Sequence, residues 1–388
     1  MNMPVKVAVC PDFREERWPS MDRVADRLID QLTRHYASTI AATPVCPPFA
    51  RRATRMWGVG RGSAAFSVDR GLNRLVDYPR HVSALGGDYD VFHVIDHSYS
   101  QLLHRLPPGR AIVTCHDLDT FRSVLEPERE PRSSLFRAMT RHILSGFRRA
   151  AYVTCDTAAV REELLARDLV SPDRAIVVPV GVSDEYSSKP DRMADESAER
   201  LLGVPADAVL ILHVGSTIPR KRIDVLLQVC AEVGTRVPGL HLVRVGGPFT
   251  DDQLSLARQL GLEERLIVLP SLDDRTLSAV YRRCALVLQP SQREGFGLPL
   301  VEAMACGTPV VASDLPVLRE VGGSAVEYSP VGDVREWTER VRALIAERGT
   351  RTDRWNARRQ AGLVRARCFS WKQFADRLAT LYREVGRS

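Results

Sequence analysis

Short apolar runs alternate with longer segments of mixed polarity along most of the chain. The runs are bounded by glycine, proline or acidic residues, as buried strands of parallel sheets are. The segments between them carry apolar residues at helical spacing; in 22–36, Val24, Leu28 and Leu32 share one face. This alternation predicts an α/β fold with parallel sheets. The runs that predict strands are 5–10, 91–96, 111–117, 152–156, 176–182, 208–215, 241–248 with its turn, 266–272, 285–289 and 310–312.

The segment 285–312 has the richest chemistry of the chain. A strand-like run is followed by Gly295 and Gly297, and Pro299 then predicts the first residue of a short helix. Unpaired N–H groups at a helix start bind anions, and glycine lets the backbone approach a phosphate closely. Glu294 and Glu302 stand on either side of this start, where carboxylates accept hydrogen bonds from hydroxyl groups. We expect both to face one crevice that binds a diphosphate and sugar hydroxyls.

This segment closely resembles the E-x7-E signature of retaining glycosyltransferases of the GT-B fold, in the large family 4 that includes glycogen-synthase-like and mannosyltransferase-like enzymes. The match continues through 307–313 and 318–322. The resemblance implies two Rossmann-like domains that face a central cleft. It places an acceptor-side domain at 1–185, a nucleotide-sugar donor domain at 186–365, and a C-terminal helix at 366–388 that crosses back to the first domain.

A basic turn after the strand 208–215 is the second part of the resemblance. Relatives use an arginine and a lysine here to neutralise the donor diphosphate, and Arg220 and Lys221 match the later basic positions. Ser216 stands where relatives often have arginine. Cations at a helix start oppose the helix dipole unless an anion binds there. The donor-binding residues implied are Gly215, Ser216, Arg220, Lys221, Ser271, Leu272, Glu294, Gly295, Phe296, Gly297, Leu298, Pro299, Leu300 and Glu302.

The resemblance also implies a catalytic set of His116, Glu294, Arg220 and Lys221. His116 ends a strand, where ligands bind in open α/β sheets, and matches the family histidine beside the donor sugar. Glu294 would hold donor sugar hydroxyls, and the two cations would stabilise the departing diphosphate. Glu302 would hold the ribose hydroxyls. We expect no metal site and no cofactor, with the nucleotide-diphosphate sugar as co-substrate.

The first strand is followed by 11–21, which lacks the G-x-G-x-x-G of dinucleotide-binding dehydrogenases. Relatives usually have a Gly-Gly loop here, and this chain has Trp18-Pro19-Ser20-Met21 instead. This departure concerns the acceptor side. The acceptor-side candidates are Trp18, Ser20, Asp96, His97 and Asp117.

Two basic segments allow more than one interpretation. The segment 133–150 predicts an amphipathic helix, which either packs on the core with a solvated face or contacts a membrane surface. The segment 46–80 is read either as a solvated loop or as a loop that faces the acceptor or a membrane. Its arginines are Arg51, Arg52, Arg55, Arg61, Arg70, Arg74 and Arg80.

The composition indicates where the protein is located and whether its cysteines are reduced. No apolar run is long enough for a bilayer, and the N-terminus lacks a signal-peptide pattern, so we expect a cytoplasmic protein; peripheral contact with the inner membrane face is left open. The net charge of +6 is a mild excess. The eight cysteines are widely spaced without a zinc pattern, which predicts reduced core thiols.

The predicted function is transfer of a sugar from a nucleotide-diphosphate sugar to a hydroxyl, with retention and without a metal. The acceptor is a glycan, a lipid-linked molecule or a small molecule, and a homodimer is left open. A glycoside hydrolase needs two carboxylates that flank one bond, whereas here we expect a phosphate site between them. The E-x7-E signature argues against an epimerase of this fold. Aromatic residues make up only 6%, which disfavours nucleic-acid binding. The remaining alternative is a degenerate relative that binds nucleotide sugar without turnover.

Overall fold

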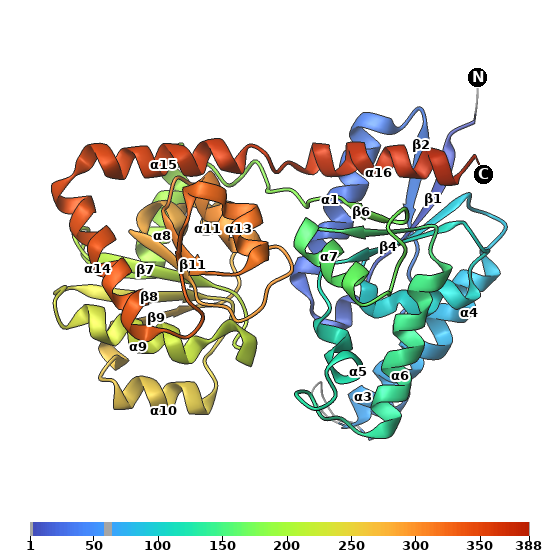
Figure 1. Cartoon of the computed structure of the whole chain (residues 1–388), viewed down its shortest axis with the longest axis horizontal. Coiled ribbons are helices and arrows are strands. Elements are labelled where there is room, and N and C mark those ends of the chain that lie inside the picture. The colour runs from blue at the N-terminus through green and yellow to red at the C-terminus, as the bar shows by residue number, and fades with distance from the viewer. Residues whose placement is uncertain (1–2, 58–63, 388) are drawn as a thin grey trace. The chain divides into compact units, whose positions relative to one another are not determined.

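The structure, a computed structural model, describes residues 3–57 and 64–387. The chain divides into two compact units, and we describe each by itself. Unit 1 comprises Met1–Val180 and Trp371–Ser388, and unit 2 comprises Gly181–Ser370. Each unit has a six-stranded parallel sheet with helices packed on it (Figure 1). The predicted α/β class is confirmed.

The sheet of unit 1 has the order β2-β1-β3-β4-β5-β6. The chain builds outward in one direction from β1 to β2 and then in the other from β3 onward, so the order reverses between β1 and β3. The strands are β1 Val5–Cys10, β2 Ile40–Pro44, β3 Val91–Val94, β4 Ala111–Cys115, β5 Tyr152–Cys155 and β6 Ala175–Val177. The α-helices are α1 Pro19–Tyr36, α2 Ala53–Trp57, α3 Ala64–Leu72, α4 Tyr78–Ala84, α5 Arg122–Leu125, α6 Ser134–Leu144, α7 Ala158–Ala166 and α16 Trp371–Val385.

The last helix, α16, packs beside α1 in unit 1 (Figure 1). Its apolar face is buried, and hydrogen bonds of tyrosine hydroxyls connect it to the rest of the unit. The Tyr36 hydroxyl donates a hydrogen bond of 2.7 Å to Asp376, and the Tyr382 hydroxyl lies 2.6 Å from His93 Nδ1. The end of the chain is therefore part of the same core as its beginning.

The sheet of unit 2 has the order β12-β11-β10-β7-β8-β9, which reverses between β7 and β10. Its strands are β7 Val209–Val214, β8 Leu240–Val245, β9 Leu266–Leu269, β10 Leu286–Gln289, β11 Val310–Ser313 and β12 Glu327–Ser329. Its α-helices are α8 Arg192–Leu202, α9 Ile223–Gly234, α10 Asp251–Gln259, α11 Asp274–Arg283, α12 Leu298–Ala305, α13 Pro316–Gly322, α14 Val334–Thr350 and α15 Thr352–Ala366.

The central strands of both sheets are buried because helices cover both faces, which explains why they read as continuous apolar runs. In unit 2, α9 and α14 pack together on the sheet, and Trp337 of α14 is fully buried in the core there. Truncating a side chain at such a site costs about 2–5 kcal/mol of unfolding free energy.

The arginine-rich segment 46–80 departs most from the prediction, because helices occupy much of the expected loop. The buried Asp69 carboxylate accepts hydrogen bonds from the amides of Arg52, Ala53 and Thr54 at 3.0, 2.7 and 3.0 Å, and so caps the start of α2. The helices of this segment are short, so the apolar repeat in each is too brief to identify from the sequence. The predicted Arg61 lies outside the described residues.

Some helix boundaries and one cysteine also differ from the prediction. Helix α1 begins at Pro19, not Asp22, because proline suits a first helical turn. The helix predicted over 133–150 ends at Leu144 and continues as the 3₁₀ helix Ser145–Arg149. There Gly146 packs so closely on Ser100 that an added Cβ would lie 2.0 Å from its carbonyl oxygen. Cys368 is exposed and thus is not the core thiol that was predicted.

Candidate functional site

The reversal of strand order in unit 2 brings two predicted segments together. Strands β7 and β10 are neighbours, and the chain leaves their carboxyl ends in opposite directions. Open α/β sheets bind ligands at such a switch point. The loop after β7 holds the basic turn, and the loop after β10 holds Glu294. Two segments far apart in the sequence therefore form one site.

The Glu294 carboxylate is the centre of this site, and only 6% of its side chain is exposed. Its Oε1 accepts hydrogen bonds from Lys221 Nζ at 2.6 Å, Ser291 Oγ at 2.7 Å and Gln289 Nε2 at 2.8 Å. Arg220 Nη1 lies 3.3 Å from Oε2. The structure thus places both predicted cations on the predicted carboxylate. Gln289 and Ser291 were not predicted, although both belong to the apolar run and motif already considered.

The charges and hydrogen bonds of this cluster favour the ionised form of Glu294. Burial would raise the pKa of Glu294, but the charges of Lys221 and Arg220 together with hydrogen bonds from Lys221 and Ser291 lower it to about 2. Glu294 is therefore ionised at neutral pH. Arg220 also joins the two loops: its Nη1 donates to the Arg293 carbonyl at 2.8 Å, and its own carbonyl accepts from the Gln292 amide at 2.7 Å. The cations are held in place before any ligand binds.

Helix α12 begins directly after the glycine loop. Gly297 has a φ of 94° and precedes the helix, and a Cβ there would lie 2.8 Å from Leu318 Cδ2, so this position requires glycine. Pro299 has no N–H, and the Leu300 amide donates to the Gly297 carbonyl at 3.0 Å. Among the amides from Gly297 to Leu300, those of Gly297 and Leu298 are therefore the ones we expect to contact a phosphate.

Glu302 lies in the middle of α12 and is only 3% exposed. Its Oε2 accepts a hydrogen bond of 2.9 Å from the hydroxyl of Tyr281 in α11. Burial raises the pKa of this tyrosine, and the Glu302 carboxylate raises it further. Tyr281 was not predicted, because nothing in the sequence relates two residues on separate helices.

The predicted base-loop residues lie farther along the same sheet edge. Ser271 is exposed and Leu272 is half-buried, and both follow the edge strand β9, which β8 separates from β7. Gly215 directly follows β7 and is half-buried, and Ser216 after it is exposed. Phe296 is buried and packs edge-on against Phe369, with ring centroids 5.4 Å apart.

In unit 1, His116 follows β4 and is buried. Its Nδ1 lies 2.7 Å from Asp156 Oδ2, and its Nε2 lies 2.9 Å from the Ile95 carbonyl oxygen. Burial would lower the pKa of His116, but the Asp156 carboxylate raises it to about 9. An imidazolium that donates both N–H groups explains this geometry. A sugar hydroxyl must therefore exchange with one of these partners to reach the ring.

Residues at the ends of neighbouring strands meet beside His116. His97 Nδ1 lies 3.2 Å from Asp96 Oδ1, and His97 Nε2 lies 3.6 Å from Asp117 Oδ1. The structure thus brings these acceptor-side candidates together. Trp18 and Ser20, in contrast, are exposed at the start of α1.

Asp12 and Asp156 belong to this edge of unit 1 and were not predicted. Asp12 follows β1 and is 3% exposed, and burial and the charge of Asp96 raise its pKa well above the usual value. Asp156 follows β5 as Asp117 follows β4. An acidic residue stands within two positions of the ends of β1, β3, β4 and β5, and this recurrence is the sequence feature that could have identified them.

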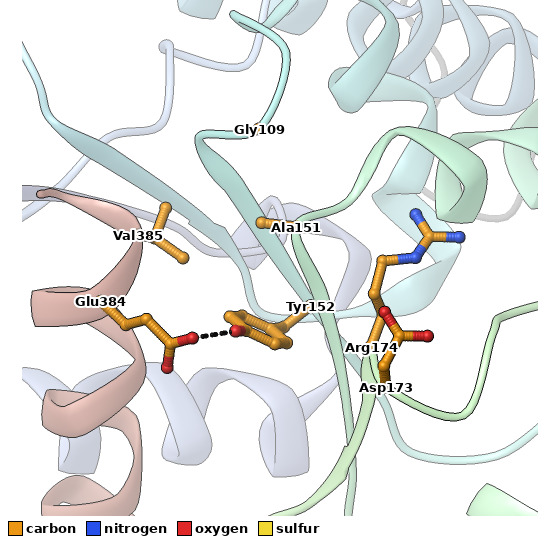
Figure 2. A pocket seen from close by; sticks show the side chains of 7 residues that line it. All are labelled: Gly109, Ala151, Tyr152, Asp173, Arg174, Glu384 and Val385. Carbon is orange, nitrogen blue, oxygen red and sulfur yellow. Dashed lines mark hydrogen bonds between the residues drawn. The ribbon is translucent and has the colours of Figure 1, made fainter. Parts of the chain in front are cut away.

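A separate cavity of 270 Å³ lies at the opposite edge of the same sheet, near the amino-terminal ends of β4, β5 and β6. Figure 2 shows the Tyr152 hydroxyl directed at Glu384 of α16, to which it is hydrogen-bonded. Ligands of such sheets bind at the other edge. The lining residues are Gly109, Ala151, Tyr152, Asp173, Arg174, Glu384 and Val385.

No helix among the described residues is long and apolar enough to cross a bilayer. No group of His, Cys, Asp and Glu side chains within the described ranges is arranged to hold a metal ion.

Comparison with known proteins gives two family models that together cover most of the chain. The model described as glycosyltransferase family 4 matches residues 21–186, and the model described as glycosyl transferases group 1 matches residues 195–361. The first match covers much of unit 1 and the second most of unit 2.

Individual relatives agree with these models. The chain is 31% identical over 317 residues to D-inositol 3-phosphate glycosyltransferase 1 of Catenulispora acidiphila. This match covers 77% of this chain and 73% of the relative. It is 32% identical over 282 residues to D-inositol 3-phosphate glycosyltransferase of Saccharomonospora viridis. That match covers 63% of this chain and 64% of the relative. The chain therefore spans slightly less than two thirds of the second protein.

Among solved structures, Anabaena HepE in complex with UDP and glucose superposes with a TM-score of 0.73 at 17% identity. The match covers 98% of this chain and 100% of that chain. At this identity the likeness shows the fold alone, which is the GT-B fold.

Proposed function

The chain belongs to glycosyltransferase family 4, and we propose that it transfers a sugar from a nucleotide-diphosphate sugar to an acceptor hydroxyl with retention at the anomeric carbon and without a metal. The observation that carries this proposal is the cluster of Arg220, Lys221 and Glu294 at the switch point of unit 2. An anion that binds there meets oriented cations, and the adjacent carboxylate accepts hydroxyl hydrogen bonds.

In the proposed mechanism, negative charge grows on the departing diphosphate as the sugar–phosphate bond breaks. Arg220 can bind phosphate oxygens in a bidentate manner, and Lys221 acts as a point charge. Because both side chains are already held by Glu294 and by the loop backbone, little reorganisation is needed when the charge develops. The amides of Gly297 and Leu298 add to this stabilisation at the start of α12.

The remaining predicted residues take the roles of orienting groups. Glu294 holds hydroxyls of the donor sugar, and Glu302, with Tyr281 behind it, holds the ribose hydroxyls. In unit 1, which we propose takes the acceptor, His116 binds a sugar hydroxyl after exchange of one hydrogen bond. The Asp156 carboxylate keeps this imidazole charged.

The substrates can be narrowed to first choices for experiments. A structural relative was crystallised with UDP and glucose, and the curated relatives are named for D-inositol 3-phosphate. UDP-sugars are therefore the first donors to test, and inositol phosphates and free inositol are the first acceptors. For a lipid-linked acceptor, helix α6 offers a membrane contact: Leu135 is 82% exposed, and Arg132 lies 5.6 Å from the Phe136 ring.

The test has two steps. Calorimetric titration with UDP, GDP, ADP and dTDP should give binding of at least one nucleotide, and NMR of the reaction with its sugar and an acceptor should show a product of retained anomeric configuration. Binding without turnover for any acceptor would favour the degenerate relative. Absence of binding for all four nucleotides would contradict the proposal.

A further inference from the structure

Arg244 is a fully buried cation next to the site. It lies near the end of β8 and has 0% exposed surface. Its Nη2 donates a hydrogen bond of 2.9 Å to the Gly215 carbonyl, and its Nη1 donates to the Gly247 carbonyl. Its guanidinium carbon lies 5.1 Å from the centroid of the Phe249 ring. One side chain thus joins the loops that follow β7 and β8.

No carboxylate in the described part of the chain forms an ion pair with Arg244, and its buried Nε has no hydrogen-bond partner there. A buried charge is costly unless it is paired. Burial accordingly lowers the pKa of Arg244 to about 10, which still leaves it charged at neutral pH. Unit 2 therefore contains a positive charge that the protein itself does not neutralise.

This charge lies under the same loop as Lys221. A Cβ added to Gly215 would lie 3.8 Å from Lys221 Cε, whereas the Gly215 carbonyl oxygen binds Arg244. Gly215 is thus flanked by both cations. The loops are also in direct backbone contact, because a Cβ on Gly246 would lie 2.4 Å from the Gly215 oxygen.

The pKa of the buried His213 also shows that Lys221 and Arg244 lie close together. Burial and the charges of Lys221 and Arg244 together lower the pKa of His213 to about 3, against the opposing effect of Glu294. One imidazole therefore senses the charges of Lys221, Arg244 and Glu294. Ser216, in contrast, is uncharged and exposed, at the position where the family resemblance implied an arginine.

We propose that Arg244 is a positioning residue for the donor diphosphate, which holds the Gly215–Ser216 turn and supplies from beneath it the positive charge that Ser216 lacks. This inference rests on the proposed function, because it assumes that the anion bound beside Lys221 is a nucleoside diphosphate. The diphosphate is then the counter-ion that the buried guanidinium otherwise does not have.

A charge acting on phosphate can be separated from a purely structural role by varying the ligand's charge. We would measure dissociation constants of UDP, UMP and uridine, or of the corresponding series for whichever of the four nucleotides binds, for the wild type and Arg244→Met. The loss of affinity should be tenfold or more for the diphosphate, smaller for the monophosphate and absent for the nucleoside. Arg244→Lys keeps the charge and should lose only a few-fold.

The chain offers a matched control and a rescue. Arg283 also donates to two backbone carbonyls of unit 2, those of Ala208 and Pro205 at 3.2 and 2.8 Å, but before the amino end of β7. Arg283→Met should destabilise unit 2 without changing nucleotide affinity. Ser216→Arg added to Arg244→Met should recover most of the lost diphosphate affinity.

Two results would overturn the inference. One is an unchanged diphosphate affinity in a folded Arg244→Met variant. The other is an equal loss of affinity for nucleoside and diphosphate, which would mean that Arg244 only holds the loops. If the wild type binds none of the four nucleotides, the proposed function fails first, and this inference fails with it.

Discussion

The carboxyl edges of the two sheets are built alike but charged differently. In unit 2, Arg220 and Lys221 bind the carboxylate of Glu294, and Arg244 lies under the same loop as Lys221. This excess of positive charge suits an anion. In unit 1, acidic residues follow one strand after another, and the charge that opposes them at β4 is the imidazolium of His116.

The difference teaches that the parallel sheet supplies positions, whereas the loop residues supply chemistry. In both units the order of strands reverses at a central pair, and polar side chains converge there. A carboxylate-rich edge accepts hydrogen bonds from hydroxyl groups and disfavours phosphate. We therefore expect donor diphosphate binding to depend on unit 2 and on its cations.

The largest effect should come from removing the lysine of unit 2. Lys221→Met should lower the rate of sugar transfer by about 10²-fold or more, because the cation stabilises the leaving diphosphate. Since its partner Glu294 is buried, the melting temperature should also fall. Adding Glu294→Gln should recover stability but not activity. Near-normal transfer by the folded single variant would contradict the assignment.

A matched lysine tests whether any lysine–carboxylate pair would behave in this way. Lys372 pairs with Asp376 at 2.9 Å on the surface of α16, where 56% of its side chain is exposed. Exposed pairs contribute little. Lys372→Met should leave both the transfer rate and the melting temperature nearly unchanged.

The ion pair of unit 1 should affect stability in a pH-dependent manner. The pKa of His116 is about 9 in the folded protein and ordinarily 6.5, so the Asp156 pair stabilises the fold fully below about pH 6.5 and loses this effect as pH rises through 9. Asp156→Asn should cost about 3 kcal/mol below pH 6.5 and much less above pH 9. Denaturant unfolding of both proteins across this pH range measures the cost in unfolding free energy. A cost independent of pH would refute the charged pair.

The smallest effect concerns Glu302, an acidic residue in the otherwise cationic unit 2 site. If it holds the ribose, Glu302→Gln should weaken ribonucleotide binding by about tenfold, because a hydrogen bond to a charged group is worth about 1.5–3 kcal/mol. Binding of the 2′-deoxy nucleotide should change less. Tyr281→Phe should act in the same direction more weakly. Equal losses for both nucleotides, measured by calorimetry, would remove the ribose role.

Local pattern by itself determined the helices with a clear apolar face, the two segments that carry Glu294 and Lys221, and ten of the twelve strands in the described residues, all but β2 and β12. These features depend on residues close in sequence: apolar runs, glycine at a left-handed turn, and proline at a helix start. The prediction for segment 46–80 failed because its helices are short and because the start of α2 is capped by a buried carboxylate, Asp69, from the following helix.

Only the tertiary structure decided which charges meet. Asp156 reaches His116 across neighbouring strands, and Arg244 reaches the Gly215 carbonyl from β8; neither pairing leaves a periodic trace in the sequence. Strand order in the sheets sets these distances, and hydrogen bonds and ion pairs act only over a few ångströms. The family of the chain could be read from its residues, but the electrostatic partners of the site required the fold.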